Sequence, residues 1–307
     1  MLRHALLRLA ASIPTLLVLA TLTFFLLRAA PGGPFDEDRV LPPDVQANLE
    51  RTYHLDEPLW EQFGRYLGGV LTGDLGASFQ YTDATVSHLI AEGAPVSFTI
   101  GSLALALALL VGGTAGIVAA LSRGGVLDRL LMAMAVGGLS IPSYVIAPLL
   151  VLLFAVTLGW LPAGGWEPGR WSDLVLPVIA LGLPQAAVIA RLMRGAMLES
   201  LGAPHVRTAR AKGLPPRVVV LRHALRPALM PVLSYLGPAA AGIVTGSVVI
   251  EQIFGVPGIG RHFVQAALNR DYPLVMGVVL FYGALIVVFN FVVDALYGVL
   301  DPRVRAP

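Results

Sequence analysis

VSFTIGSLALALALLVGGTAGIVAAL, residues 96–121, is a run without a single charged side chain. A helix needs about 20 apolar residues to cross a hydrocarbon core about 30 Å thick, so this run is long enough to span a membrane. Comparable apolar runs occupy residues 9–27, 130–158, 174–189, 229–250 and 274–300. The sequence therefore predicts an all-α integral membrane protein with six transmembrane helices.

The composition of the chain excludes several classes of protein. Of its 307 residues, 56% are hydrophobic and 13% are charged, which does not fit a water-soluble globule. The chain has no cysteine, and its only lysine, Lys212, precedes a glycine, so no GK[ST] phosphate-binding loop can occur. The six histidines lie outside the predicted spans, and no Ser-His pair, aspartate pair or metal-ligand set lies at membrane depth. We therefore predict no catalytic residue, no metal site and no ATPase activity in this chain.

Charge asymmetry predicts the orientation in the membrane. Arginines gather at residues 3–8, 123–129, 191–226 and 303–305, whereas acidic residues gather at 36–92. By the positive-inside rule, both termini are cytoplasmic. The first run is too long for a signal peptide, and Arg28 is unsuited to a cleavage site at Ala30. We expect an N-terminal anchor helix at 1–28, an extracytoplasmic loop at 29–94, and a transmembrane domain at 95–307 that includes a cytoplasmic loop at 191–228.

The extracytoplasmic loop contains an amphipathic helix pattern. Apolar residues recur at helical spacing after Pro58, at positions 59, 60, 63, 66, 67, 70 and 71. Such a helix either covers the mouth of the bundle or rests on the lipid interface. The GxxxG pairs Gly112–Gly116 and Gly242–Gly246 predict close helix approach, either within the chain or at a subunit interface.

A few ionisable residues and prolines lie in or near the spans. Asp294 lies within the last span, where we expect it to pair with a cytoplasmic arginine or to hydrogen-bond within the bundle. Glu251 and Asp173 lie near the outer ends of their spans, where we expect water to reach them. Helix-breaking residues inside the spans are expected to be tolerated, namely Pro142, Pro148, Pro184 and Pro238.

The cytoplasmic segment 191–226 is long, basic and patterned. Pro204 can open a short helix that runs through Lys212, and Gly213 can close it, before the Leu-Pro-Pro stop at 214–216. This pattern predicts a helical hairpin, with a solvated positive loop as the alternative.

At this segment the sequence resembles the permease subunits of bacterial binding-protein-dependent ABC importers for peptides. HVRTARAKGL at 205–214 and LRHALRPAL at 221–229 are similar to the EAA loop of that family. Arg207, Thr208 and Ala209 stand where the general motif has Glu-Ala-Ala, a departure that is usual in peptide permeases. Further similar motifs lie at 13–15, 30–35, 254–260, 269–273 and 301–305.

The resemblance implies a fold, a mechanism and partners. It implies the type I ABC importer permease fold in the bacterial cytoplasmic (inner) membrane. It also implies a coupling helix that docks on an ATPase, formed by Arg207, Thr208, Ala209, Arg210, Ala211, Lys212 and Gly213. The expected partners are a second homologous permease subunit in a heterodimer, two cytoplasmic ATPase subunits that bind ATP and Mg²⁺, an extracytoplasmic peptide-binding protein and membrane lipid. No nucleic acid and no cofactor bound by this chain are expected.

The resemblance also suggests a substrate. The short outer loop WLPAGGW at 160–166 resembles that of the oligopeptide B-type subunit, so we expect uptake of oligopeptides. Dipeptides, glutathione, nickel and some sugars are carried by permeases of the same fold, and these substrates stay open. A secondary transporter that works as a single chain, without ATPases, is a further alternative. No substrate-binding residue is assigned.

Overall fold

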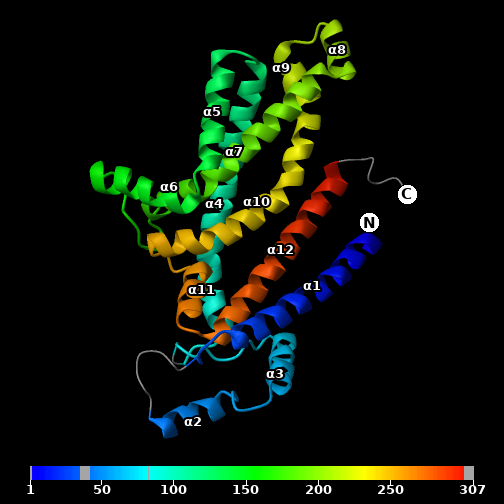
Figure 1. Ribbon diagram of the computed structural model, residues 1–307. Helices are drawn as coiled ribbons and strands as arrows, with labels where there is room; N and C mark the ends of the chain where they lie inside the picture. The colour runs from blue at the N-terminus through cyan, green and yellow to red at the C-terminus, as the bar shows by residue number, and fades with distance from the viewer. Residues whose placement is uncertain (1, 35–41, 82, 301–307) are drawn as a thin grey trace. The chain divides into compact units, whose positions relative to one another are not determined.

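The computed structural model describes residues 2–34, 42–81 and 83–300, and in this part of the chain the ordered elements are helices joined by loops (Figure 1). The motif at 301–305 and Phe35 lie outside these ranges, as does the side chain of Asp294. The elements are α1 (Leu2–Ala29), α2 (Pro43–Thr52), α3 (Leu59–Thr72), α4 (Val86–Leu121), α5 (Val126–Ser140), α6 (Ser143–Leu150), the π-helical segment η1 (Val151–Thr157), α7 (Ser172–Gly202), α8 (Pro204–Ala211), α9 (Pro216–Val218), the π-helical segment η2 (Val219–Ala224), α10 (Leu225–Phe254), α11 (Ile259–Leu268) and α12 (Tyr272–Leu300).

Five helical stretches are long and apolar enough to cross a membrane, and a bent pair makes up to six. The five are Ala11–Ala29, Val86–Leu121, Ser172–Gly202, Pro216–Phe254 and Tyr272–Val293. The pair corresponds to the predicted span at 130–158, but its halves, Val126–Ser140 and Ser143–Thr157, are bent by 103°.

The bend corrects the expectation that Pro142 is accommodated inside a continuous helix. A proline disfavours the helical conformation in the residue before it, and Ile141 is extended, with φ −100° and ψ 119°. The helix therefore ends at Ser140 and restarts after Pro142. By contrast, Pro148, Pro184 and Pro238 lie within α6, α7 and α10, as expected.

The chain divides into two compact units, each described by itself. The first consists of Met1–Ser97 and Pro257–Val287, and the second of Phe98–Val256 and Val288–Pro307. In the second unit, α4, α5, α6 and α10 pack around α7.

Both GxxxG pairs pack against α7, so they serve contacts within the chain. A Cβ built on Gly112 would collide with the backbone carbonyl of Ala186, and one on Gly116 would lie 2.5 Å from that of Ala190. The Gly242–Gly246 pair of α10 lies against the side chains of Gln185 and Leu181, which are also on α7. Small residues thus let α4 and α10 approach α7 closely.

The first unit joins two of the motifs noted in the sequence, at 30–34 and 269–273. The Arg270 guanidinium donates to the Gly33 carbonyl at 3.3 Å, and the Tyr272 hydroxyl donates to the Gly32 carbonyl at 3.3 Å. Gly32 has φ +90°, and a Cβ there would overlap the Arg270 guanidinium. The glycine is required for both reasons.

Asp271 anchors the start of α12. Its carboxylate has no exposed surface and accepts hydrogen bonds from the Ser78 hydroxyl, from the Gln80 N–H at 3.4 Å and from the Leu274 N–H at 3.2 Å. One buried aspartate thereby ties the loop before α4 to the first turn of α12.

The structure corrects the expectation for Asp173 and Glu251. Both are buried, with 5% and 0% of their surface exposed. Asp173 accepts a hydrogen bond from the Glu167 N–H at 3.0 Å. The loop at 160–166 packs on the end of α10, where the Gly165 N–H donates to the Phe254 carbonyl at 2.7 Å. The prediction that water reaches these two carboxyls is therefore wrong.

Candidate functional site

The basic segment between α7 and α10 forms a helical hairpin at the end of these two long helices (Figure 1). Ala203 alone joins α7 to α8, in an extended conformation with φ −67° and ψ 150°. Pro204 occupies the first position of α8, where its missing N–H costs no hydrogen bond. Residues 212–215 then turn the chain into α9 and η2. The prediction of a helical hairpin is confirmed.

Gly213 ends the first arm of the hairpin in the left-handed conformation. Its φ is +75°, and its N–H donates to the Arg210 carbonyl at 2.9 Å. A Cβ at Gly213 would meet no heavy atom within 4 Å. A substitution is therefore opposed by backbone strain alone, of the order of 1–3 kcal/mol for a residue forced into this region.

The two faces of α8 differ in burial. Val206 and Ala209 are buried and pack with residues of α7, η2 and α10, among them Met197 and Ala224. Of the seven residues predicted to form a coupling helix, Ala209 anchors α8 to the hairpin. The other six, Arg207, Thr208, Arg210, Ala211, Lys212 and Gly213, are exposed.

The exposed face is strongly basic. Within the hairpin Arg207, Arg210, Lys212, Arg217 and Arg222 are all exposed, and no ion pair is found for them among the described residues. This surface suits an acidic partner. A basic rim of this kind raises the rate and specificity of association more than the affinity.

Ser200 near the end of α7 and His205 on α8 complete the hydrogen bonding of the second arm. Pro227 has no N–H, so in a regular helix the carbonyl of His223 would lack its donor four residues ahead. Nε2 of His205 lies 3.1 Å from this carbonyl, and the Ser200 hydroxyl donates to the next one, of Ala224, at 2.8 Å. The π-helical segment η2 ends at this point. His205 and Ser200 thus close the hairpin at its base.

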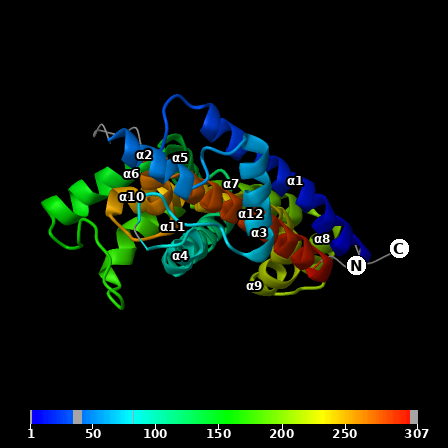
Figure 2. The ribbon, with the colours of Figure 1, turned by 90° about the horizontal axis from the view of Figure 1, so that it is seen from below.

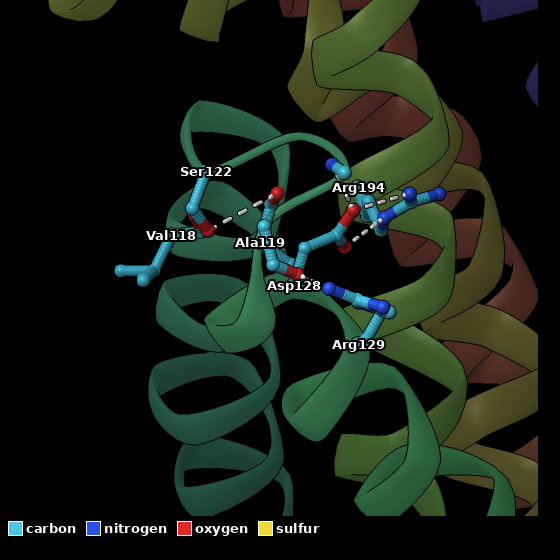
Figure 3. Close-up of polar contacts among 8 residues, drawn as sticks. Val118, Ala119, Ser122, Asp128, Arg129 and Arg194 are labelled. Atoms are coloured by element: carbon cyan, nitrogen blue, oxygen red, sulfur yellow. Dashed lines mark hydrogen bonds and ion pairs between the residues drawn. The ribbon is translucent and has the colours of Figure 1, made fainter.

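An ion pair joins α7, the helix that leads into the hairpin, to the start of α5. In Figure 3, the Arg194 guanidinium on α7 faces the carboxylate of Asp128 in the first turn of α5. Nε and Nη2 of Arg194 donate to the two carboxylate oxygens at 2.6 and 2.8 Å, and the Gly124 N–H donates to Oδ2 at 2.9 Å. This two-bond geometry fixes orientation as well as charge. It ties the loop between α4 and α5 to α7, which leads into α8.

The sequence did not reveal these contacts. Asp128 and Arg194 are 66 residues apart, and no sequence pattern marks them as partners. For His205 a signal existed, because Pro227 implies a carbonyl in need of another donor. Among the described residues, no group of three or more His, Asp or Glu side chains could hold a metal ion.

Comparison with known proteins identifies the family. Residues 112–306 match the model for the binding-protein-dependent transport system inner membrane component, and residues 1–100 match the N-terminal model of the same kind of component. The chain belongs to this family. It is therefore a membrane permease component and not a catalytic subunit. The family implies ATPase and binding-protein partners.

Several curated relatives match along the full length. The chain is 50% identical over 305 residues to the oligopeptide transport system permease protein OppB of Haemophilus influenzae and 52% identical to that of Salmonella typhimurium, covering 99% of this chain and 100% of each relative. It is 45% identical to the dipeptide transport system permease protein DppB of Bacillus subtilis, covering 99% of this chain and 98% of the relative.

Solved structures support the fold. The MetNI methionine ABC transporter in an inward-facing conformation matches with a TM-score of 0.58 at 19% identity, covering 69% of this chain and 96% of the other. An amino acid ABC transporter crystallised with histidines matches with a TM-score of 0.53 at 16% identity, covering 68% and 92%. The type I ABC importer permease fold that the sequence predicts is thereby confirmed.

Proposed function

We propose that this chain is the permease subunit of an ATP-driven importer that takes up oligopeptides delivered by an extracytoplasmic binding protein. The observation that carries the proposal is the 50–52% identity to oligopeptide permeases along the whole chain. The relatives named for dipeptide transport are 45% and 41% identical, so dipeptides are the second candidate.

The proposed assembly contains more than this chain. A second, homologous permease completes the pore, and two cytoplasmic ATPase subunits bind ATP and Mg²⁺. Both termini and the α7–α10 hairpin lie on the cytoplasmic side, supported by the arginines at 191–226 and the acidic residues at 36–92. The proposed domain organisation is an anchor helix at 1–28, an outer loop at 29–94 and a transmembrane domain at 95–307.

In this proposal α8 is the coupling helix that docks on an ATPase subunit. The exposed residues Arg207, Thr208, Arg210, Ala211, Lys212 and Gly213 contact the ATPase, and buried Ala209 passes the movement into the hairpin. Closure of the ATPase pair then rocks the permease pair between inward-open and outward-open states. What supports this role is the short helix with one buried side and one exposed basic side.

The substrate is tested by ATP-dependent uptake of labelled peptides, two to five residues long, into cells with and without this chain. We expect uptake of the longer peptides to be lost without it. Unchanged uptake at every length contradicts the oligopeptide assignment, and loss confined to the shortest peptides favours the dipeptide alternative.

Coupling is tested by Gly213→Val in the complete, reconstituted transporter. The β-branched side chain opposes the positive φ, so the turn after α8 rearranges while membrane insertion is unaffected. We expect ATP hydrolysis to continue with little uptake. Gly202→Ala at the other end of α8 is the matched control, because Gly202 has no positive φ and its Cβ would meet nothing within 4 Å. Normal peptide uptake per ATP in Gly213→Val contradicts the coupling role.

A further inference from the structure

Helix α3 of the first unit presents an apolar stripe that no described residue covers. Trp60 and Leu71 are 73% and 88% exposed. Gly64 and Gly68, which are exposed, and Leu67, which is half-buried, lie between them at helical spacing, so these five residues share one face of the helix and are called the stripe. A surface helix of a soluble protein directs charged or polar side chains to water, and this face of α3 carries none.

The polar side of α3 is separate from the stripe. Glu61 and Arg65 project from it, and Nη2 of Arg65 donates to both carboxylate oxygens of Glu57 at 2.6 and 2.7 Å. This pair, together with the bond from His54 at 2.8 Å, holds the pKa of the Glu57 carboxyl below its usual range. Arg65 is thus paired with Glu57 on a side of α3 that the stripe does not occupy.

The remaining face of α3 fixes the helix to the end of a membrane span. The ring of Phe63 lies 5.0 Å from that of Phe24 on α1, and Nε and Nη2 of Arg28 donate to Oε1 of Gln62 at 3.0 and 2.9 Å. Figure 2 shows the ribbon of α3 beside that of α1. The span of α1 ends at Ala29. Helix α3 therefore lies at the level where the hydrocarbon ends and the lipid headgroups begin.

Exposed apolar side chains of α1 lie beside α3. Leu22, Phe25 and Leu26 are 55%, 43% and 68% exposed on the last turns of the span, and Phe25 contacts Phe63 with ring centroids 5.7 Å apart. Tryptophan favours the interface because its ring is apolar and its N–H is polar. We propose that the Trp60–Leu71 stripe of α3 lies in the lipid interface, where it anchors the loop between α1 and α4 to the membrane surface.

The proposal is tested with Trp60 as a fluorescent probe. The chain has four tryptophans, and replacing Trp160, Trp166 and Trp171 by phenylalanine leaves Trp60 alone. The complete transporter is reconstituted in vesicles whose lipids are brominated either near the headgroup or deep in the acyl chain. The fluorescence of a matching transporter that also carries Trp60→Phe is subtracted, so that only the signal of Trp60 remains. Interfacial helices are buried about 5–10 Å into the headgroup and acyl boundary, so we expect shallow bromines to quench Trp60 strongly and aqueous iodide to quench it weakly.

The matched control moves the probe to the polar face. In the same background, Trp60→Phe combined with Glu61→Trp places the indole one residue further along, where we expect strong quenching by iodide and little by brominated lipid. If iodide quenches Trp60 as strongly as it quenches the control probe, the proposal is overturned. Protection of Trp60 that arises only when a peptide-loaded binding protein is added also overturns it, because the stripe is then a protein docking surface. The readout does not use transport, so it is independent of the proposed substrate.

Discussion

The close approach of α4 to α7 at Gly116 predicts the outcome of a small substitution. In Gly116→Ala the new Cβ lies 2.5 Å from the Ala190 carbonyl oxygen, 2.7 Å from the Met193 Cβ and 3.0 Å from the Arg194 N. None of these three atoms can rotate away, because two belong to the backbone and the third is bonded to it. The helices must separate locally, and overpacking of this kind costs about 1–3 kcal/mol.

The matched control is Gly113→Ala, one turn earlier on the same helix. A Cβ at Gly113 meets nothing within 4 Å. Replacing a glycine inside a helix by alanine is favourable by about 1 kcal/mol in both variants, so their difference isolates the overpacking. At about 2–4 °C per kcal/mol for domains of 150–250 residues, the two melting temperatures should differ by several degrees.

The assay is thermal unfolding of the purified permease in detergent, followed by intrinsic fluorescence and by loss of the monodisperse peak. We expect Gly113→Ala to melt at or above the wild type and Gly116→Ala to melt below it. If Gly116→Ala melts together with Gly113→Ala, α4 does not approach the α7 backbone at this point, and the account of the GxxxG pair is refuted.

Three further predictions concern the hairpin, the ion pair between Asp128 and Arg194, and the half-buried His262. His205→Ala removes the hydrogen bond to the His223 carbonyl, worth about 0.5–1.5 kcal/mol. Pro227→Ala gives that carbonyl a backbone donor, so we expect His205→Ala to lower the melting temperature in the wild type but not in the Pro227→Ala background. Additive effects of the two substitutions contradict the capping role of His205. Asp128→Asn and Arg194→Lys each weaken the two-bond ion pair that holds α7 to the start of α5, so we expect peptide uptake per ATP to fall while membrane insertion stays normal. If both variants take up as much peptide per ATP as the wild type, this ion pair does not contribute to coupling. Burial lowers the pKa of His262, so below about pH 6.5 the unfolded chain binds more protons than the folded chain. We therefore expect the free energy of unfolding to decrease as the pH falls through this range. If a His262→Phe variant shows the same pH dependence, another group is responsible.

The helical architecture follows from the sequence because long uncharged runs have few alternatives. In lipid, a helix satisfies its own backbone hydrogen bonds, so a run such as 96–121 predicts its own structure. Gly213 was predictable for a similar reason, since a glycine after a short helix favours the left-handed conformation that the structure has at +75°. These are local properties.

The predictions that were wrong concern features that depend on contacts between segments distant in the sequence. A proline inside an apolar run is compatible with both a kink and a break, and the sequence does not distinguish the 103° bend at Pro142 from the continuous helix at Pro184. The helix end that carries Glu251 packs against a loop some 90 residues earlier, at 160–166, and the sequence does not show that contact. The ion pair between Asp128 and Arg194 is hidden in the same way, because arginines on the cytoplasmic side are already explained by topology.

The single-residue joint at Ala203 makes the two ends of α8 mechanically unequal. Ala203 is hydrogen-bonded on both sides, through its N–H to Ser200 and through its carbonyl to Val206 and Arg207, each at 3.1 Å. One residue offers two backbone torsions, and these bonds restrain both. The other end of α8 is followed by the four residues 212–215, so more backbone torsions lie between α8 and the next helical segment. In the proposed coupling role, movement of α8 therefore reaches α7 through one restrained residue but reaches α10 only through residues 212–224, so α7 is the more rigidly connected of the two helices.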